Sequence, residues 1–274
     1  MEKHAYATES GTVHYWTAGP RNSGACTLVF LPGLTADHTL FDAQVAYFSD
    51  AHRCIVWDAP AHGKSRPYPL DFSLDDYALI LHGILSKENV SRPVLVGQSL
   101  GGYVAQAYID LFPGEVAGFV SIDSAPLKRI YYPKWEIAAL RHTKGMYLSI
   151  PWRLLKRWGS FGTAATLHGR AQMRAMMERY ERREYCELAA HGYFMLADAI
   201  DACRAYAIDC PALLLCGEHD RAGDVRPFNK KWNKGEGISL VWIPRAGHNS
   251  NVDNPEFVNS QIEHFLHSID GENA

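Results

Sequence analysis

The chain has 274 residues, of which 47% are hydrophobic, and it carries a formal net charge of −3. This length suffices for one large domain, or one domain with an insertion, around a sizeable core. So small a net charge gives no electrostatic reason to expect a nucleic acid or an anionic membrane as a partner. No apolar stretch is long enough to span a bilayer, and the polar start lacks the pattern of a secretory signal. The six cysteines form no Cys-x-x-Cys pair and several lie in apolar runs, so we expect buried free thiols in a cytoplasmic protein.

Strand-like and helix-like patterns alternate up to about residue 126. Residues 11–17 alternate between polar and apolar side chains, which is typical of a half-exposed strand. Short apolar runs that predict buried strands follow at 26–31, 53–57, 93–96 and 116–122. Apolar residues at helical spacing predict helices over 73–85 and 100–112. Strands that alternate with helices indicate a parallel sheet with helices on both of its faces.

The pattern changes between about residues 126 and 205, where no clear buried strand occurs. This stretch is rich in helix formers, aromatic residues and clustered basic residues. One interpretation is a helical insertion with solvated charged faces, and the other is a lid whose aromatic side chains line a substrate pocket. Strand-like runs resume at 212–216 and 239–243, and a closing helix is predicted over about 255–269. We therefore predict a core made of residues 1–126 and 206–274, with a helical cap over residues 127–205.

A candidate nucleophile lies in Gly97-Gln98-Ser99-Leu100-Gly101, between an apolar strand and a helix. A serine hydroxyl attacks well only when it is held clear of the sheet and beside a base. A sharp strand-to-helix turn exposes it, and glycine two residues before and after removes side chains that would collide there. The amide of Leu100, at the helix N-terminus, can donate to an oxyanion.

The chain resembles the α/β-hydrolase superfamily, in particular its serine hydrolases with a cap domain. Besides the Ser99 turn, two further motifs come in the family's order: Leu31-Pro-Gly-Leu-Thr35, and Asp58-Ala-Pro-Ala-His-Gly-Lys-Ser65. The resemblance implies a mostly parallel, eight-stranded α/β-hydrolase sheet with helices on both faces and a helical cap insertion. An aspartate nucleophile, as in the family's dehalogenases and epoxide hydrolases, is excluded because the position is Ser99.

The resemblance also implies an acid and a histidine that follow late strands, in the order Ser99, Asp220, His248. His248 would take the Ser99 proton and return it to the leaving group, while Asp220 would orient and stabilise the imidazole. Asp123 also ends a strand and remains an alternative acid. Asp224 is a lesser alternative to Asp220.

Two backbone amides are expected to form the oxyanion hole, those of Leu34 and Leu100. The Leu34 loop departs from the family, because Pro32 stands where a histidine is frequent, and this leaves open how the loop is braced. In the second motif, Asp58, His62 and Ser65 are interpreted as scaffold rather than as catalysts. His264 and His267 have a spacing that can chelate a metal, but no third ligand is near, so we expect no metal site and no cofactor.

These residues predict a Ser-His-Asp hydrolase that forms an acyl-enzyme with a small, largely apolar carboxylic ester. The same triad would also serve a carbon–carbon bond hydrolase, a lactonase, a thioesterase, an amidase or a perhydrolase. A receptor that binds a small ligand with little turnover is the alternative from another class. An arginine of the cap that bound a substrate carboxylate would favour the carbon–carbon hydrolase; the candidates are Arg129, Arg141, Arg153, Arg157, Arg170 and Arg174.

Overall fold

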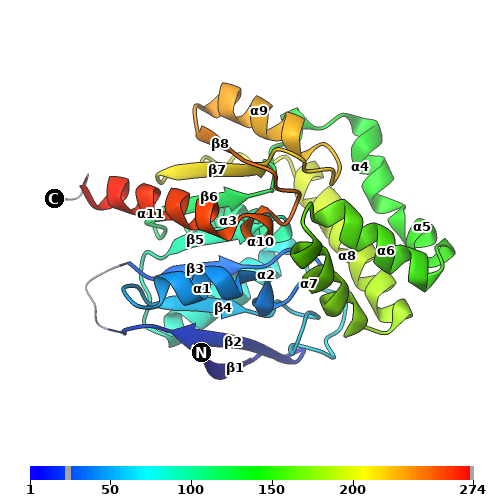
Figure 1. The fold of residues 1–274 in the computed structure, drawn as a ribbon, viewed down its shortest axis with the longest axis horizontal. Helices are drawn as coiled ribbons and strands as arrows, with labels where there is room; N and C mark the ends of the chain where they lie inside the picture. The colour runs from blue at the N-terminus through cyan, green and yellow to red at the C-terminus, as the bar shows by residue number, and fades with distance from the viewer. Residues whose placement is uncertain (22–25, 272–274) are drawn as a thin grey trace.

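An eight-stranded sheet runs through the centre of the computed structural model, which describes residues 1–21 and 26–271 (Figure 1). The strand order is β1-β2-β4-β3-β5-β6-β7-β8. β1 pairs antiparallel with β2 and β2 pairs antiparallel with β4, whereas all pairings from β4 to β8 are parallel. This confirms the predicted fold class. The strands are β1 (Glu2–Ala7), β2 (Thr12–Ala18), β3 (Leu28–Leu31), β4 (Cys54–Trp57), β5 (Val94–Gln98), β6 (Gly118–Ile122), β7 (Ala212–Gly217) and β8 (Ser239–Ile243).

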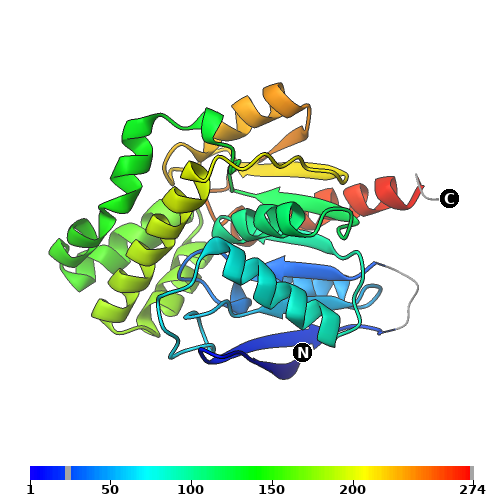
Figure 2. The ribbon, with the colours of Figure 1, turned by 180° about the vertical axis from the view of Figure 1, so that it is seen from behind.

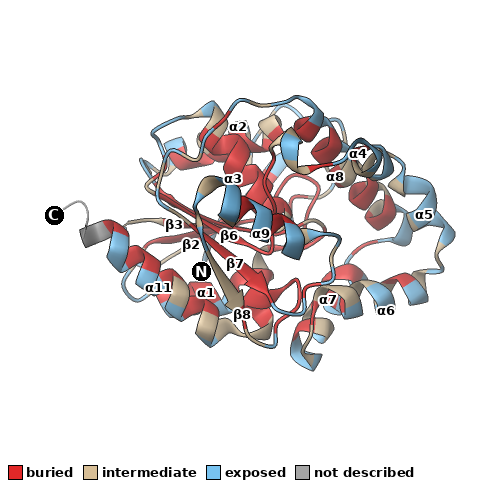
Figure 3. Cartoon of the chain, turned by 90° about the horizontal axis from the view of Figure 1, so that it is seen from above, coloured by how far each residue is buried: buried red, intermediate tan, exposed pale blue. Residues whose placement is uncertain are grey.

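Helices cover both faces of this sheet. The helices α2 (Leu74–Lys87), α3 (Leu100–Leu111) and α9 (Val225–Glu236) lie on one face (Figure 2). The other face carries α1 (Asp42–Phe48), α10 (Ser250–Asp253) and α11 (Pro255–Gly271), with the 3-10 helix η1 (His38–Phe41) beside them (Figure 1). Every residue of β3, β4, β5 and β6 is therefore buried, which explains why each appears in the sequence as a continuous apolar run (Figure 3).

Three elements of this core have no clear apolar run or helical periodicity in the sequence. β1 is an edge strand with no buried residue, so it contains no apolar run. α1 is only seven residues long, and α9 is strongly polar on its solvent side. By contrast, the predicted start of α2 is correct: Ser73 accepts a hydrogen bond from the Asp76 amide and the Asp76 carboxylate accepts one from the Ser73 amide.

The segment between β6 and β7, residues 123–211, contains helices and no strand. Its elements are η2 (Arg129–Tyr131), α4 (Lys134–Arg141), α5 (Thr143–Ser149), α6 (Trp152–Thr163), α7 (Leu167–Glu178) and α8 (Arg182–Asp201). We call residues 127–205 the cap segment. It packs beside one end of the sheet, with α5 and α6 at the end of the molecule opposite the C-terminal end of α11 (Figure 1). In the described part of the chain, no helix has the length and apolar character needed to cross a bilayer.

Polar contacts fasten the cap segment to the core near the ends of the strands. The Asp253 carboxylate accepts hydrogen bonds from the amides of Ala165 and Thr166, at 2.7 and 2.9 Å. The amide of Asn249 donates to the carbonyl of Thr163 at 2.7 Å. These contacts hold the start of α7 and the end of α6 against the loop that follows β8.

Candidate active site

Ser99 occupies a strained turn between β5 and α3. Its backbone has φ 50° and ψ −115°, a conformation that non-glycine residues rarely adopt. A Cβ on Gly97 would lie 2.4 Å from the backbone of Gly101, and a Cβ on Gly101 would lie 1.8 Å from the carbonyl oxygen of Leu31. Both positions therefore require glycine. The turn is held by hydrogen bonds from the Ser99 amide to the carbonyl of Ile122 and from the Ser124 hydroxyl to the Ser99 carbonyl.

The structure brings Ser99, His248 and Asp220 together from three separate loops. The Ser99 Oγ lies 2.9 Å from the His248 Nε2, and the His248 Nδ1 lies 2.9 Å from an oxygen of Asp220. The other Asp220 oxygen accepts a hydrogen bond from the Ala222 amide at 2.8 Å. Both the acid and the histidine are buried. The three side chains thus form one continuous chain of hydrogen bonds that ends on the serine hydroxyl.

The alternative acids lie elsewhere in the hydrogen-bond network. The two oxygens of Asp123 accept hydrogen bonds from the amides of Gly217 and Ser250, at 2.7 and 3.0 Å, and not from the imidazole. Asp224 is exposed, at the start of α9. Since Gly217 begins the turn to Asp220 and Ser250 follows His248, Asp123 ties together the two loops that carry the acid and the histidine.

Burial and neighbouring charges set the electrostatics of these groups. Burial alone would lower the pKa of His248, but the Asp220 carboxylate, its hydrogen bond and the charge of Asp123 together raise the pKa above the ordinary 6.5. The pKa of Asp123 is raised, chiefly because the group is fully buried and also because Asp220 is negatively charged. A carboxylate oxygen of Asp123 and one of Asp220 lie within 4.8 Å of each other. When Asp123 is ionised, its negative charge adds to that of Asp220 and favours the imidazolium form of His248.

The two amides expected at the oxyanion hole flank the serine. Leu34 follows Gly33, and a Cβ built on Gly33 would lie 3.1 Å from the Cβ of Ser99, so this loop passes close to Ser99. Leu100 is the first residue of α3. Within the described residues, neither amide donates a hydrogen bond to another protein group. Both are therefore available to a ligand atom.

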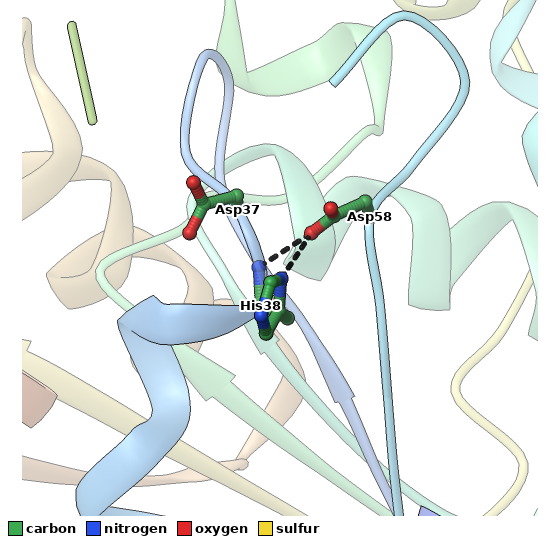
Figure 4. A group of neighbouring side chains, drawn as sticks. All are labelled: Asp37, His38 and Asp58. Carbon is green, nitrogen blue, oxygen red and sulfur yellow. Dashed lines mark hydrogen bonds and ion pairs between the residues drawn. The ribbon is translucent and has the colours of Figure 1, made fainter. Parts of the chain in front are cut away.

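Asp58 braces the loop that lacks the family's histidine. One oxygen of this buried carboxylate accepts hydrogen bonds from the amide and the Nδ1 of His38, at 2.7 and 2.8 Å (Figure 4). Its other oxygen accepts from the Lys64 amide at 2.6 Å. Asp58 thus joins its own turn to the end of the loop that carries Leu34. Asp37 lies beside this pair and binds Arg179, so the acidic oxygens here already have nitrogen partners rather than a vacant cation site.

His62 and Ser65 complete this scaffold. The Ser65 hydroxyl donates to the Asp58 carbonyl at 2.6 Å and accepts from the His14 amide at 2.8 Å. His62 Nδ1 lies 2.9 Å from the Pro60 carbonyl, and the burial of this ring lowers its pKa to about 4. Neither side chain reaches Ser99 or His248 by a hydrogen bond among the described residues.

Ser99 and His248 open into a cavity of about 240 Å³ between the core and the cap segment. Its core side is formed by the loops at Leu34 and Asn249, and its cap side by α5, α6, α7 and α8. Among the aromatic residues of the cap segment, four line this cavity: Tyr147, Trp158, Tyr185 and Tyr193. These four side chains therefore match the lid interpretation of the sequence. The lining also contains Leu155, Met173 and Ala189, so the cavity is largely apolar.

None of the six candidate arginines of the cap segment lines this cavity. Arg129 and Arg141 form ion pairs with acids of α8, and Arg174 forms one with Glu178. Gln98, by contrast, lines the cavity although it was not predicted as a site residue. Its amide group donates to the His248 carbonyl at 2.8 Å, so it helps to position the histidine loop. The only sequence signal for this role was its place next to Ser99.

The chain matches the model of the alpha/beta hydrolase family over residues 28–261. It belongs to that family. The matched range includes the Ser99 turn, the cap segment, Asp220 and His248.

Relatives that span nearly the whole chain have different printed activities. A 2-hydroxy-6-oxononadienedioate/2-hydroxy-6-oxononatrienedioate hydrolase of Paraburkholderia phymatum is 25% identical, over 96% of this chain and 95% of the relative. Carboxylesterase YbfK of Bacillus subtilis is 24% identical, over 95% of this chain and 86% of the relative. A shorter match, 30% identical over 112 residues, covers only 41% of a relative from Pantoea ananatis.

Solved structures agree on the fold. An esterase from Thermogutta terrifontis superimposes with a TM-score of 0.81 at 20% identity, covering 98% of this chain and 99% of that chain. The enol-lactonase of Burkholderia xenovorans gives a TM-score of 0.73 at 20% identity, covering 96% and 100%. At these identities the likeness concerns the fold, and the substrate has to be argued from the site itself.

Proposed function

We propose that this α/β hydrolase is a serine carboxylic ester hydrolase. Ser99 is the nucleophile, His248 is the general base, and Asp220 is the carboxylate that orients and stabilises the imidazole. The observation that carries the proposal is the unbroken chain of hydrogen bonds from Asp220 through His248 to the Ser99 hydroxyl, at 2.9 Å for each step. This chain ends in a cavity large enough for a small acyl compound.

The reaction follows from the positions of these groups. As the Ser99 oxygen bonds to the substrate carbonyl carbon, its proton passes to His248 Nε2, and Asp220 stabilises the imidazolium. The oxygen that becomes negative would be held by the amides of Leu34 and Leu100, the second of which lies at the N-terminus of α3. His248 then protonates the leaving alkoxide. A water molecule then gives a proton to the same imidazole as its oxygen bonds to the acyl carbon. The bond to the Ser99 oxygen breaks, His248 returns the proton to that oxygen, and the carboxylic acid leaves.

The lining of the cavity favours an uncharged substrate. Apart from His248 itself, the side chains that line it are apolar, aromatic or neutral amides and hydroxyls. A substrate carboxylate buried there would have no cationic side chain to compensate for its lost hydration. This argues for a small ester over the dioate named for the Paraburkholderia relative. A neutral lactone is the second candidate, because a cyclic ester needs the same triad and the same apolar walls.

A panel of substrates with matched serine variants tests the proposal. Ser99→Ala should lower kcat on a short p-nitrophenyl ester by at least about 10⁴-fold. Ser86→Ala, an exposed serine on α2, should leave it unchanged. A fluorophosphonate probe should label the wild type and Ser86→Ala but not Ser99→Ala. Faster turnover of lactones or vinylogous 1,5-diketones than of esters would reassign the substrate class. An absence of labelling in folded wild-type protein would support the receptor interpretation.

A further inference from the structure

The basic residues of the chain are concentrated in the cap segment. Residues 134–163, which contain α4, α5 and α6, include six lysines and arginines but one acid, Glu136, whereas the whole chain has a net charge of −3. Three of these basic residues are neutralised by ion pairs: Arg141, Lys144 and Lys156. Among the described residues, no ion pair or hydrogen bond involves the side chains of Arg153 and Arg157. The small net charge of the chain therefore conceals a locally positive surface.

The exposed face of α6 combines these arginines with large apolar side chains. Leu154, Trp158 and Phe161 are spaced at i, i+4 and i+7, so they share one face, and they are 38%, 56% and 50% exposed. Arg153 and Arg157 form the neighbouring ridge of the same helix. No acidic residue occurs anywhere in α6. A helix with a basic and aromatic outer face of this kind is typical of segments that lie in a membrane interface.

Two more arginines surround the end of this face. The guanidinium groups of Arg170 and Arg221 lie 4.4 and 5.7 Å from the centre of the Phe161 ring. Both line a cleft of about 200 Å³ together with His219. Neither arginine forms an ion pair with an acid in the described part of the chain. Phe161 is thus an exposed aromatic residue with two cations near its ring, which suits a surface that meets both phosphate groups and acyl chains.

The same face also borders the opening of the active-site cavity. Met146 of α5 is 52% exposed, and both it and Trp158 line the cavity. Since these side chains are at once exposed and cavity-lining, they belong to its mouth. We define the cap-tip patch as Met146, Arg153, Leu154, Arg157, Trp158 and Phe161. Met146 lies on α5 and the other five residues lie on α6, two neighbouring helices of the cap segment (Figure 3).

We propose that the cap-tip patch docks onto the surface of an anionic phospholipid bilayer. Charge complementarity favours this occupant over a second copy of the chain, because a two-fold contact would place the same unpaired arginines against one another. A bilayer also accepts Trp, Leu and Phe side chains below the headgroups while its phosphates meet the arginines. In this orientation the mouth of the cavity faces the lipid, and a lipophilic substrate can enter without crossing water.

Sedimentation with lipid vesicles tests the proposal without any turnover. Wild-type protein should bind phosphatidylcholine vesicles containing about 30% phosphatidylglycerol and bind pure phosphatidylcholine at least about tenfold more weakly. Raising NaCl from about 50 mM to about 500 mM should release it from the mixed vesicles. Arg153→Glu with Arg157→Glu, and separately Leu154→Ser with Phe161→Ser, should each weaken binding to the mixed vesicles by about tenfold or more.

The matched control is Lys3→Glu with Lys234→Glu, which makes the same change in net charge at exposed residues of β1 and α9. It should bind vesicles like the wild type. Equal loss in this control, binding that ignores salt, or no vesicle binding by the wild type would overturn the proposal. A stable dimer that Leu154→Ser with Phe161→Ser dissociates would assign the patch to self-association instead. Failure of docking would leave the proposed ester hydrolysis untouched, because the binding assay contains no substrate.

Discussion

The two walls of the active-site cavity are held in place by different forces. On the core side, steric exclusion and hydrogen bonds to the backbone fix each group. Gly97 and Gly101 leave no room for a side chain, and the two oxygens of Asp123 accept hydrogen bonds from two backbone amides. On the cap side, the lining residues Leu155, Met173 and Tyr185 are held by side-chain packing. We therefore expect substitutions on the core side to lower turnover of every substrate. Substitutions of single cap side chains should instead change which substrate fits.

The ion pairs of the cap segment contribute little to this arrangement. Most have at least one partner whose side chain is about half exposed, such as Asp198 in its pair with Arg141 and Glu178 in its pair with Lys156. Exposed pairs of this kind stabilise a fold by only about 0–1 kcal/mol each. Apolar burial, at about 1.5–3 kcal/mol for a side chain such as Leu or Met, is the stronger force.

The largest effect is expected on the core side, from Asp220→Asn. The amide keeps the shape of the side chain but no longer stabilises the imidazolium or selects the tautomer, so kcat should fall by about 10⁴-fold. Asp224→Asn, at an exposed carboxylate four residues later, should leave kcat within twofold of the wild type, which is about 0.4 kcal/mol. Steady-state kinetics on one ester measures both. Similar losses in the two variants would contradict the assignment of the acid.

A smaller effect on the core side is expected from Asp123→Asn. Asparagine tolerates the positive φ of 48° at this position, but its amide nitrogen cannot accept the hydrogen bond of Gly217 or Ser250. The unpaired amide should lower the free energy of unfolding by about 1–3 kcal/mol. Displacement of the two loops should lower kcat by about 10- to 100-fold. Urea unfolding and kcat together test this, and a loss as large as that of Asp220→Asn would mean that Asp123 is the acid instead.

The pH dependence of kcat/KM tests how the charge of Asp123 affects the pKa of His248, apart from the hydrogen bonds that Asp123 accepts. His248 acts as a base only when it is neutral, and its pKa is raised above 6.5, so kcat/KM should decline as the pH falls through a value above 6.5. Asp123→Asn removes a negative charge that raises this pKa. The acid limb of the profile should therefore move to lower pH in the variant. An unchanged or higher midpoint would contradict the electrostatic role of Asp123.

On the cap side, Leu155→Ala should change the preference for the acyl chain. The substitution enlarges the cavity, so the ratio of kcat/KM for an octanoyl ester to that for an acetyl ester should rise by about tenfold. Leu188→Ala removes a buried leucine of α8 that does not line the cavity. It should destabilise the protein to a similar degree, by about 2–5 kcal/mol, without changing this ratio. Equal ratios in the two variants would show that Leu155 does not limit the substrate.

The smallest effect is expected from Arg174→Ala on the surface of α7. Its partner is Glu178, one turn later, and both side chains are about half exposed. The free energy of unfolding should change by less than about 0.5 kcal/mol. KM should not change for a neutral ester or for a half-ester that carries a free carboxylate. A KM increase confined to the half-ester would restore the cap arginines as candidates for binding an acidic substrate.

The fold and the turn at Ser99 were largely predictable because they depend on local patterns. Buried parallel strands appear as apolar runs, and the turn at Ser99 has glycines where any side chain would collide. The chain order of Ser99, Asp220 and His248 then follows from the resemblance to one family. β1 and α9 escaped prediction because an exposed edge strand and a polar helix bury too little apolar surface to leave a periodic signal.

The tertiary structure decided matters that depend on contacts between distant residues. Asp123 and Asp220 both follow strands, and only the packing of three loops shows which of them meets the His248 ring. The four aromatic residues that line the cavity could not be separated from the others of the cap segment, because amphipathic helices give the same pattern whether they face a pocket or a small core. By itself, the sequence therefore determined that Ser99 lies in a tight strand-to-helix turn, since backbone geometry enforces that turn locally. The lining of the cavity at Ser99 depends on side chains that come together only after the chain has folded.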